Sequence, residues 1–198
     1  MTSATHCFEV DTPAPMMLHD EIIDKRAWQR DHVSPSDWLI PFPEAGVAEL
    51  DEAVAILDQY PQPNHHLTLD QLPSLMTCRQ VMTQVRTTLY QSGMAVIDHL
   101  PVDRYSTEQN KIIYRLLGQM LGRVVDQKWG GTTLYDVKDS GKALGHGVRR
   151  SITNLGQPFH TDGPWLSMTP EIVSLFCLQT AQTGVMSRLV SLITAHNE

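Results

Sequence analysis

Three stretches of the chain repeat apolar residues at the spacing of an amphipathic helix. An apolar residue at every third or fourth position forms one stripe along a helix, and that stripe packs on a core. The spacing predicts helices over residues 44–60, over 70–91 and from Ser106 to about Gly122. The residues expected to face the core are Val47, Leu50, Val54 and Leu57, then Cys78, Met82, Val85 and Leu89, and finally Ile112, Ile113, Leu116, Leu117 and Met120.

Apolar runs of strand length follow the second predicted helix and recur towards the end of the chain. The run Gly93-Met94-Ala95-Val96-Ile97 predicts a short buried strand. Further strands are expected over residues 172–178 and 189–193. Cys177 lies inside the first of these two runs, where a small apolar side chain is expected to belong to the core.

The first 43 residues are rich in Pro, Asp and Trp and have no sustained period. They predict an irregular arm over residues 1–43, with Trp28 and Trp38 packing on the main body because exposed indoles are unfavourable. The domain proper is then expected over residues 44–198. Helices that pack beside strands clustered later in the chain indicate an α+β fold.

Composition restricts the class of protein. The chain has 198 residues, of which 41% are hydrophobic and 19% charged, as in a globular domain. A net charge of −7 argues against nucleic-acid binding, and no apolar run reaches the roughly 20 residues of a membrane span. The 3 cysteines are odd in number and far apart, which excludes a disulfide framework. With no secretory signal, a cytoplasmic protein is expected.

The clearest chemical motif is Gln157-Pro158-Phe159-His160-Thr161-Asp162-Gly163-Pro164-Trp165. Residues two apart project from the same face of an extended strand, so His160 and Asp162 are expected to converge on one point, with a few Å between His160 Nε2 and a carboxylate oxygen. One imidazole and one carboxylate are two of the three ligands of the facial triad that binds non-haem Fe(II). A surface turn at Asp-Gly-Pro is the alternative.

Sequence around this motif resembles the TauD/TfdA family of Fe(II)- and 2-oxoglutarate-dependent dioxygenases. The resemblance covers about half the chain, weakly from residue 92 and specifically over 147–197. The matching pieces are Val148-Arg149-Arg150-Ser151, Phe159-His160-Thr161-Asp162-Gly163, Thr169-Pro170, the apolar run of residues 172–178, and Gly184-Val185-Met186-Ser187. Val185 departs from the family, which usually has a second glycine there. A β-branched residue resists the positive φ that glycine allows.

The resemblance implies a fold, cofactors and roles for residues. It implies a double-stranded β-helix, or jelly roll, with flanking N-terminal helices, and it makes His160 and Asp162 the metal ligands. Ser187, which lies 27 residues after His160, would donate its hydroxyl to 2-oxoglutarate. Fe(II), 2-oxoglutarate and O₂ would then oxidise a small organic substrate with release of succinate and CO₂.

The same resemblance places a third ligand, a His, and an Arg that binds 2-oxoglutarate far beyond the H-x-D motif. This sequence ends 36 residues after Asp162. We therefore expect an incomplete jelly roll and little or no turnover. The alternative is a truncated, inactive fragment that acts as a binding or regulatory module. Exposed apolar strands also predict self-association or a homo-oligomer. His196 is the only later His, and a position in a helix argues against its being a ligand.

Two further features have both a functional and a structural interpretation. Arg149 and Arg150 either attract an anionic substrate or steady the site, or they form a solvated basic turn. Residues 127–147 contain 5 glycines and form either a mobile edge of an active site or an ordinary connection. Trp129-Gly130-Gly131 and Tyr135 lie in this loop, and no role is assigned to them.

Overall fold

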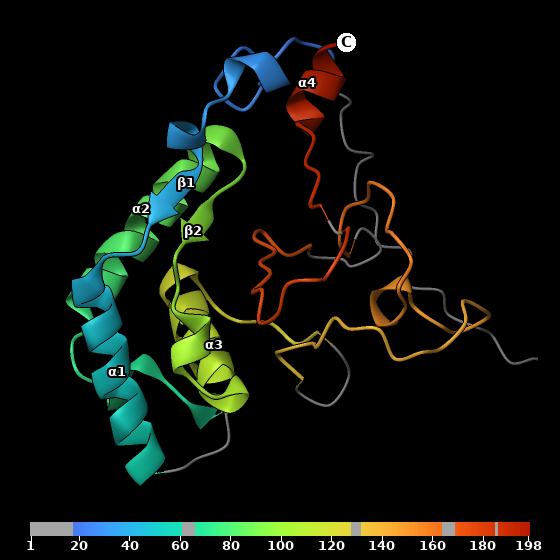
Figure 1. Ribbon diagram of the computed structural model, residues 1–198. Helices are drawn as coiled ribbons and strands as arrows, with labels where there is room; N and C mark the ends of the chain where they lie inside the picture. The colour runs from blue at the N-terminus through green and yellow to red at the C-terminus, as the bar shows by residue number, and fades with distance from the viewer. Residues whose placement is uncertain (1–17, 61–65, 128–131, 164–168, 185) are drawn as a thin grey trace, which may run out of the picture.

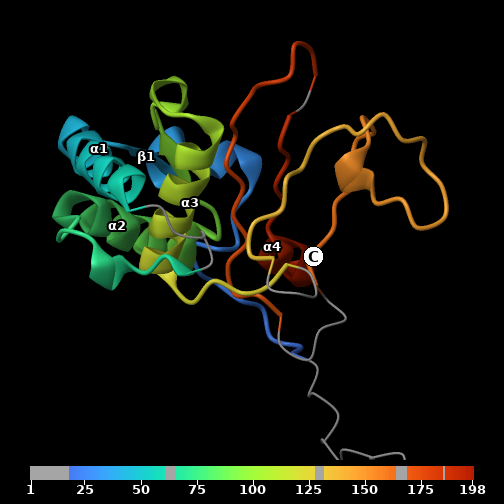
Figure 2. The same cartoon turned by 90° about the horizontal axis from the view of Figure 1, so that it is seen from below.

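The computed structural model describes residues 18–60, 66–127, 132–163, 169–184 and 186–198. Figures 1 and 2 show the three long helices and a small sheet gathered on one side and long irregular segments on the other. The helices are α1 (Glu44–Gln59), α2 (Met76–Ser92), α3 (Thr107–Leu121) and α4 (Leu192–Asn197), and the strands are β1 (Leu39–Pro41) and β2 (Val96–Asp98). The 3₁₀ turns are η1 (Arg30–His32), η2 (Pro35–Asp37), η4 (Leu69–Gln71), η5 (Val102–Arg104) and η6 (Arg150–Ile152). Within these residues, no helix has the length and apolar character needed to cross a membrane.

The helices predicted over residues 44–60 and 106–122 are confirmed as α1 and α3. Ser106 starts α3 with a capping box. Its Oγ accepts a hydrogen bond from the backbone N–H of Gln109 at 3.2 Å, and its own N–H donates to Gln109 Oε1 at 2.8 Å. The side chains of Ser106 and Gln109 therefore accept hydrogen bonds from two backbone N–H groups that have no partner within the helix.

Helix α2 begins six residues later than the predicted start at Asp70. Pro73 explains the delay, because proline lacks a backbone donor and disfavours the helical conformation in the residue before it. A side chain from α1 caps the true start. Glu49 accepts hydrogen bonds from the backbone N–H groups of Thr77 at 2.8 Å and Cys78 at 2.9 Å. Burial by itself raises the pKa of Glu49, but these hydrogen bonds outweigh it and lower that pKa.

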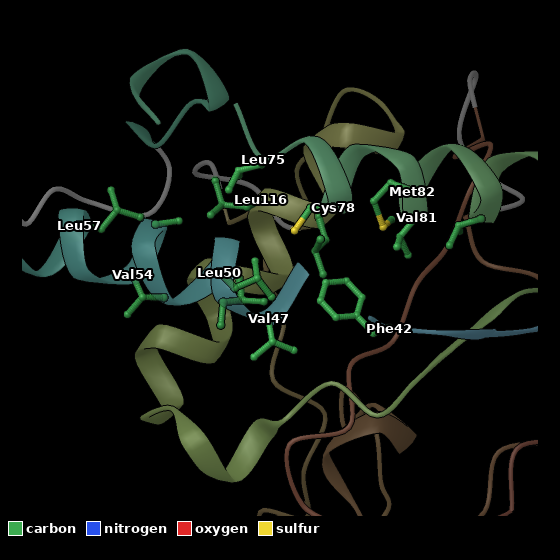
Figure 3. Packing of buried hydrophobic residues seen from close by; sticks show 14 of the residues in the cluster. Phe42, Val47, Leu50, Val54, Leu57, Leu75, Cys78, Val81, Met82 and Leu116 are labelled. Atoms are coloured by element: carbon green, nitrogen blue, oxygen red, sulfur yellow. The ribbon is translucent and has the colours of Figure 1, made fainter. Parts of the chain in front are cut away.

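The three long helices pack around one apolar core (Figure 3). The predicted core faces are confirmed, with Leu89, Ile112 and Met120 partly buried and the rest of the predicted set buried. Phe42 packs so closely on α1 that a Cβ added at Gly46 would lie 2.9 Å from Phe42 Cε1. The Sγ of Cys78 donates to the Gly46 carbonyl at 3.5 Å. A side chain at position 46 would therefore force the Phe42 ring to shift.

Strand β1 lies inside the segment expected to be irregular. It pairs in parallel with β2, with Leu39 opposite Val96. A strand was expected at residues 93–97, and β2 overlaps its end. The prediction that this strand is buried is wrong, because Val96 is 43% exposed. A two-stranded sheet covers only part of each strand. The indole of Trp28 donates to the Ser92 carbonyl at 2.6 Å, so this Trp does pack on the main body.

The strands expected over residues 172–178 and 189–193 are wrong, because the described residues there form no strand and the second run leads into α4. A strand needs a hydrogen-bonded neighbour, and the sheet in the described residues is the β1–β2 pair. Cys177 is exposed, so its predicted core position is also wrong. Leu175 is 80% exposed, and the predicted self-association stays a prediction.

Two tyrosines attach this irregular segment to the helices. Tyr90 of α2 donates its hydroxyl to Glu171 Oε1, and Tyr114 of α3 donates to the Ser174 carbonyl at 2.6 Å. The rings of Tyr114 and Phe176 stack with their centroids 5.3 Å apart. The stretch after the H-x-D motif is therefore held along α2 and α3 by side chains instead of by a strand ladder.

Helix α4 lies beside the segment that precedes β1, at the top of Figure 1. Asn197 accepts the backbone N–H of Ile22 at 3.0 Å through Oδ1 and donates to its carbonyl at 2.9 Å through Nδ2. Thr194 Oγ1 donates to the Trp28 carbonyl at 2.8 Å. These contacts, together with the Trp28 indole on Ser92, connect α4 to the helical core.

Candidate functional site

The H-x-D motif lies in an irregular stretch that follows η6, so its expected position on a strand is wrong. Arg150 braces the start of this stretch, because its Nη1 donates a hydrogen bond to the Gly156 carbonyl at 2.8 Å. That contact favours the steadying role among the interpretations of the basic pair. Gly163 follows the motif with φ of 64°, a left-handed conformation that favours glycine. The arginine and the glycine therefore shape the chain on either side of His160 and Asp162.

The side chains of His160 and Asp162 converge although no strand aligns them. His160 Nε2 and Asp162 Oδ1 lie 3.5 Å apart, and the two side chains are 43% and 53% exposed. His160 Nδ1 donates to the Pro158 carbonyl at 2.8 Å. A hydrogen bond of this kind fixes the tautomer and the ring orientation of a ligating imidazole. It leaves Nε2, which lies 3.5 Å from Asp162 Oδ1, as the acceptor nitrogen of the ring.

The carboxamide of Gln157 also reaches His160. Its Nε2 lies 3.2 Å from His160 Nε2 and donates to it, because the other ring nitrogen carries the proton. Reasoning from the sequence missed this residue. The available signal was an amide side chain three residues before the His, which is too common a pattern to single out without the geometry.

The donor pair fits a divalent metal such as Fe(II). With metal–ligand bonds of about 2.1 Å, donors 3.5 Å apart subtend about 110° at the ion. That angle is close to the tetrahedral value. A small movement of the exposed side chains would bring it to the octahedral value. Among the described residues, no group of three or more His, Cys, Asp or Glu side chains could hold a metal. The pair alone therefore offers two donors, fewer than a metal site needs.

Other predicted residues lie apart from this pair. Ser187 is exposed in an irregular segment, and the described residues show no hydrogen bond between it and the pair. Gly184 has φ of 79°, as a glycine turn requires, whereas Val185 lies outside the described residues. His196 is in α4, and its Nε2 donates to the Asp20 carbonyl at 3.1 Å. The role of Ser187 towards 2-oxoglutarate stays a prediction.

The loop before the site is braced at several points. Arg115 of α3 donates to Thr133 Oγ1 at 2.7 Å, and Tyr135 Oη lies 3.2 Å from Ser151 Oγ. Ser140 donates its backbone N–H to the Ile152 carbonyl at 2.9 Å. Trp129-Gly130-Gly131 lie outside the described residues. These contacts connect α3, by way of residues 132–147, to the turn η6 that precedes the motif.

Comparison with known proteins identifies a family for this chain. The family model of the taurine catabolism dioxygenase TauD, TfdA family matches residues 58–198, which include helices α2, α3 and α4 and the H-x-D motif. No curated protein matches the chain. Because the match covers well over half of the sequence, the chain belongs to the TauD/TfdA family.

Proposed function

We propose that this chain carries the metal site of an Fe(II)- and 2-oxoglutarate-dependent dioxygenase that acts on a small organic substrate. The supporting observation is the His160–Asp162 pair, whose donor atoms lie 3.5 Å apart within the matched region. An imidazole nitrogen and a carboxylate oxygen are two donors of the facial triad. Bound Fe(II), with 2-oxoglutarate and O₂, would supply the oxidation and release succinate and CO₂.

The residues of the chain would hold and orient these groups. The Pro158 carbonyl fixes the His160 ring so that Nε2 is the donor. Asp162 adds a negative charge that offsets part of the charge of a divalent cation. Ser187 is proposed to donate its hydroxyl to an oxygen of 2-oxoglutarate, as in the family. From the family we propose a double-stranded β-helix for the domain, whereas the sheet in the described residues is the β1–β2 pair. From the cysteine usage we propose a cytoplasmic location.

A second candidate is a binding or regulatory module without turnover. The observation that favours it is the lack, within the described residues, of a third His, Cys, Asp or Glu beside the pair. Two protein donors bind Fe(II) more weakly than three. We therefore expect slow turnover at most from the 198-residue chain.

Turnover of 2-oxoglutarate separates the two candidates. Purified chain is incubated with Fe(II), ascorbate, 2-oxoglutarate and O₂, and succinate is measured over time. The matched variants are His160→Ala and His146→Ala, both of which remove an exposed His from a loop. The dioxygenase predicts slow succinate formation that His146→Ala retains and His160→Ala reduces to background. Equal succinate in wild type and His160→Ala would favour the binding module.

A further inference from the structure

Two side chains approach Nε2 of His160, the ring nitrogen proposed to bind a metal. Gln157 Nε2 lies 3.2 Å from His160 Nε2, and Asp162 Oδ1 lies 3.5 Å from the same atom. All three residues, His160 included, are exposed. They come from one six-residue stretch that begins at Gln157 and ends at Asp162.

These separations are the distances between neighbouring ligand atoms around a metal ion. For bonds of about 2.1 Å, adjacent donors lie about 3.0 Å apart in an octahedron and about 3.4 Å apart in a tetrahedron. The Gln157–His160 distance of 3.2 Å falls between the two values, and the His160–Asp162 distance of 3.5 Å is near the larger. Small rotations of exposed side chains are enough to reach either geometry.

The carboxamide of Gln157 can present a donor atom to a cation. Its terminal Nε2 and Oε1 are nearly the same size, so a half turn about the last side-chain bond exchanges them. Without a metal, the N–H group faces the Nε2 lone pair of His160. A cation on that lone pair repels the N–H group and attracts the carbonyl oxygen, which is a hard donor suited to divalent ions such as Mn²⁺.

We propose that Gln157 is a metal ligand of this site and that Gln157 Oε1, His160 Nε2 and an Asp162 carboxylate oxygen together bind one divalent cation. The inference rests on the proposed metal role of His160 and Asp162 and extends it by a third, neutral oxygen donor. It explains how a loop with only one His and one Asp can offer three donors.

Metal affinity tests the proposal without reference to turnover. Co(II) is titrated into the 198-residue chain at pH 7, with its visible absorption bands and heat of binding as readouts. Gln157→Ala removes the proposed donor, whereas Gln157→Glu replaces it with a charged one. Gln182→Ala and Gln182→Glu are matched controls, because Gln182 is exposed in another loop. His160→Ala reports whether the site is at the motif at all.

We expect Gln157→Ala to weaken Co(II) binding about tenfold and Gln157→Glu to tighten it about tenfold, in the range that supporting residues of metal sites show. Both Gln182 variants should bind as wild type does. If Gln157 only competes with the metal for the His160 lone pair, Gln157→Ala binds Co(II) equally or more tightly, and the proposal is overturned. A Gln157→Glu variant no tighter than wild type overturns it as well. Unchanged Co(II) binding by His160→Ala would instead reject the proposed function, because the metal would then lie elsewhere.

Discussion

The contact between Glu49 and the start of α2 offers a prediction about how the helical core is held together. The carboxylate accepts backbone N–H groups of Thr77 and Cys78 at 2.8 and 2.9 Å. Leu75, at the N-cap position of α2, provides no side-chain cap. Glu49→Gln leaves one oxygen acceptor and turns an NH₂ group towards the other backbone donor. The variant therefore loses one hydrogen bond and the negative charge at the positive end of the helix.

The expected loss follows from these two contributions. A hydrogen bond to a charged group contributes about 1.5–3 kcal/mol, and a charge at a helix end about 0.3–1 kcal/mol. Because Glu49 is only partly buried, water replaces some of what is lost. We expect Glu49→Gln to lower the free energy of unfolding by about 2 kcal/mol and Glu49→Ala by about 3 kcal/mol.

The effect should depend on pH in one direction. The pKa of Glu49 is lowered in the folded chain, so the ionised carboxylate favours folding. That stability is fully present above the unfolded pKa of Glu, about 4.3, and is lost as the pH falls through the lower folded pKa. The difference between wild type and Glu49→Gln is therefore widest near neutral pH and shrinks in acid.

Urea unfolding followed by circular dichroism measures this difference at about pH 7 and about pH 3.5. Glu52→Gln is the matched control, because it removes the same charge from an exposed position of α1. If Glu49→Gln is no less stable than Glu52→Gln at neutral pH, Glu49 does not cap α2. A gap between the two variants that widens in acid would contradict the sign of the linkage.

Two further predictions concern the core. Gly46→Ala should lower the free energy of unfolding by about 1 kcal/mol, because overpacking against Phe42 outweighs the gain in helix propensity. Gly118→Ala should raise it by about 0.5–1 kcal/mol, because the nearest atom to its added Cβ would be 4.0 Å away. Equal stabilities of the two variants in urea would contradict this prediction. Iodoacetamide should label the exposed Cys177 and spare Cys78 in the folded chain, because burial first, and the nearby Glu49 second, raise the pKa of the Cys78 thiol to about 12. Peptide mass spectrometry checks it, and equal labelling rates would show that the core is open.

The helices were predictable because their signals are local. The stripe through Leu50 and Leu57 and the Ser106 capping residue act within a few positions of one another. Strands depend on partners far away in the sequence, and apolar character at Leu175 does not supply one. Strand β1 was missed because three residues ending in Pro41 carry no measurable period. The cap from Glu49 was also hidden, since it joins residues 28 positions apart.

The candidate site was predictable in its chemistry and not in its surroundings. Residue types and spacing singled out His160 and Asp162, and their side chains do approach within 3.5 Å. The strand expected to align them is absent from the described stretch. Their orientation comes instead from the Pro158 carbonyl, from Gln157 and from the turn at Gly163. Such contacts depend on the path of an irregular loop, which no hydrophobic period encodes.

We propose that His160 and Asp162 bind one metal ion. The most direct measurement is a crystal structure of the chain with Mn(II), which has a strong anomalous signal and replaces Fe(II) without its redox chemistry. We expect one anomalous peak bonded at about 2.0–2.2 Å to both His160 Nε2 and an Asp162 carboxylate oxygen. A peak bonded to neither residue, or no peak near the motif at saturating Mn(II), would contradict it.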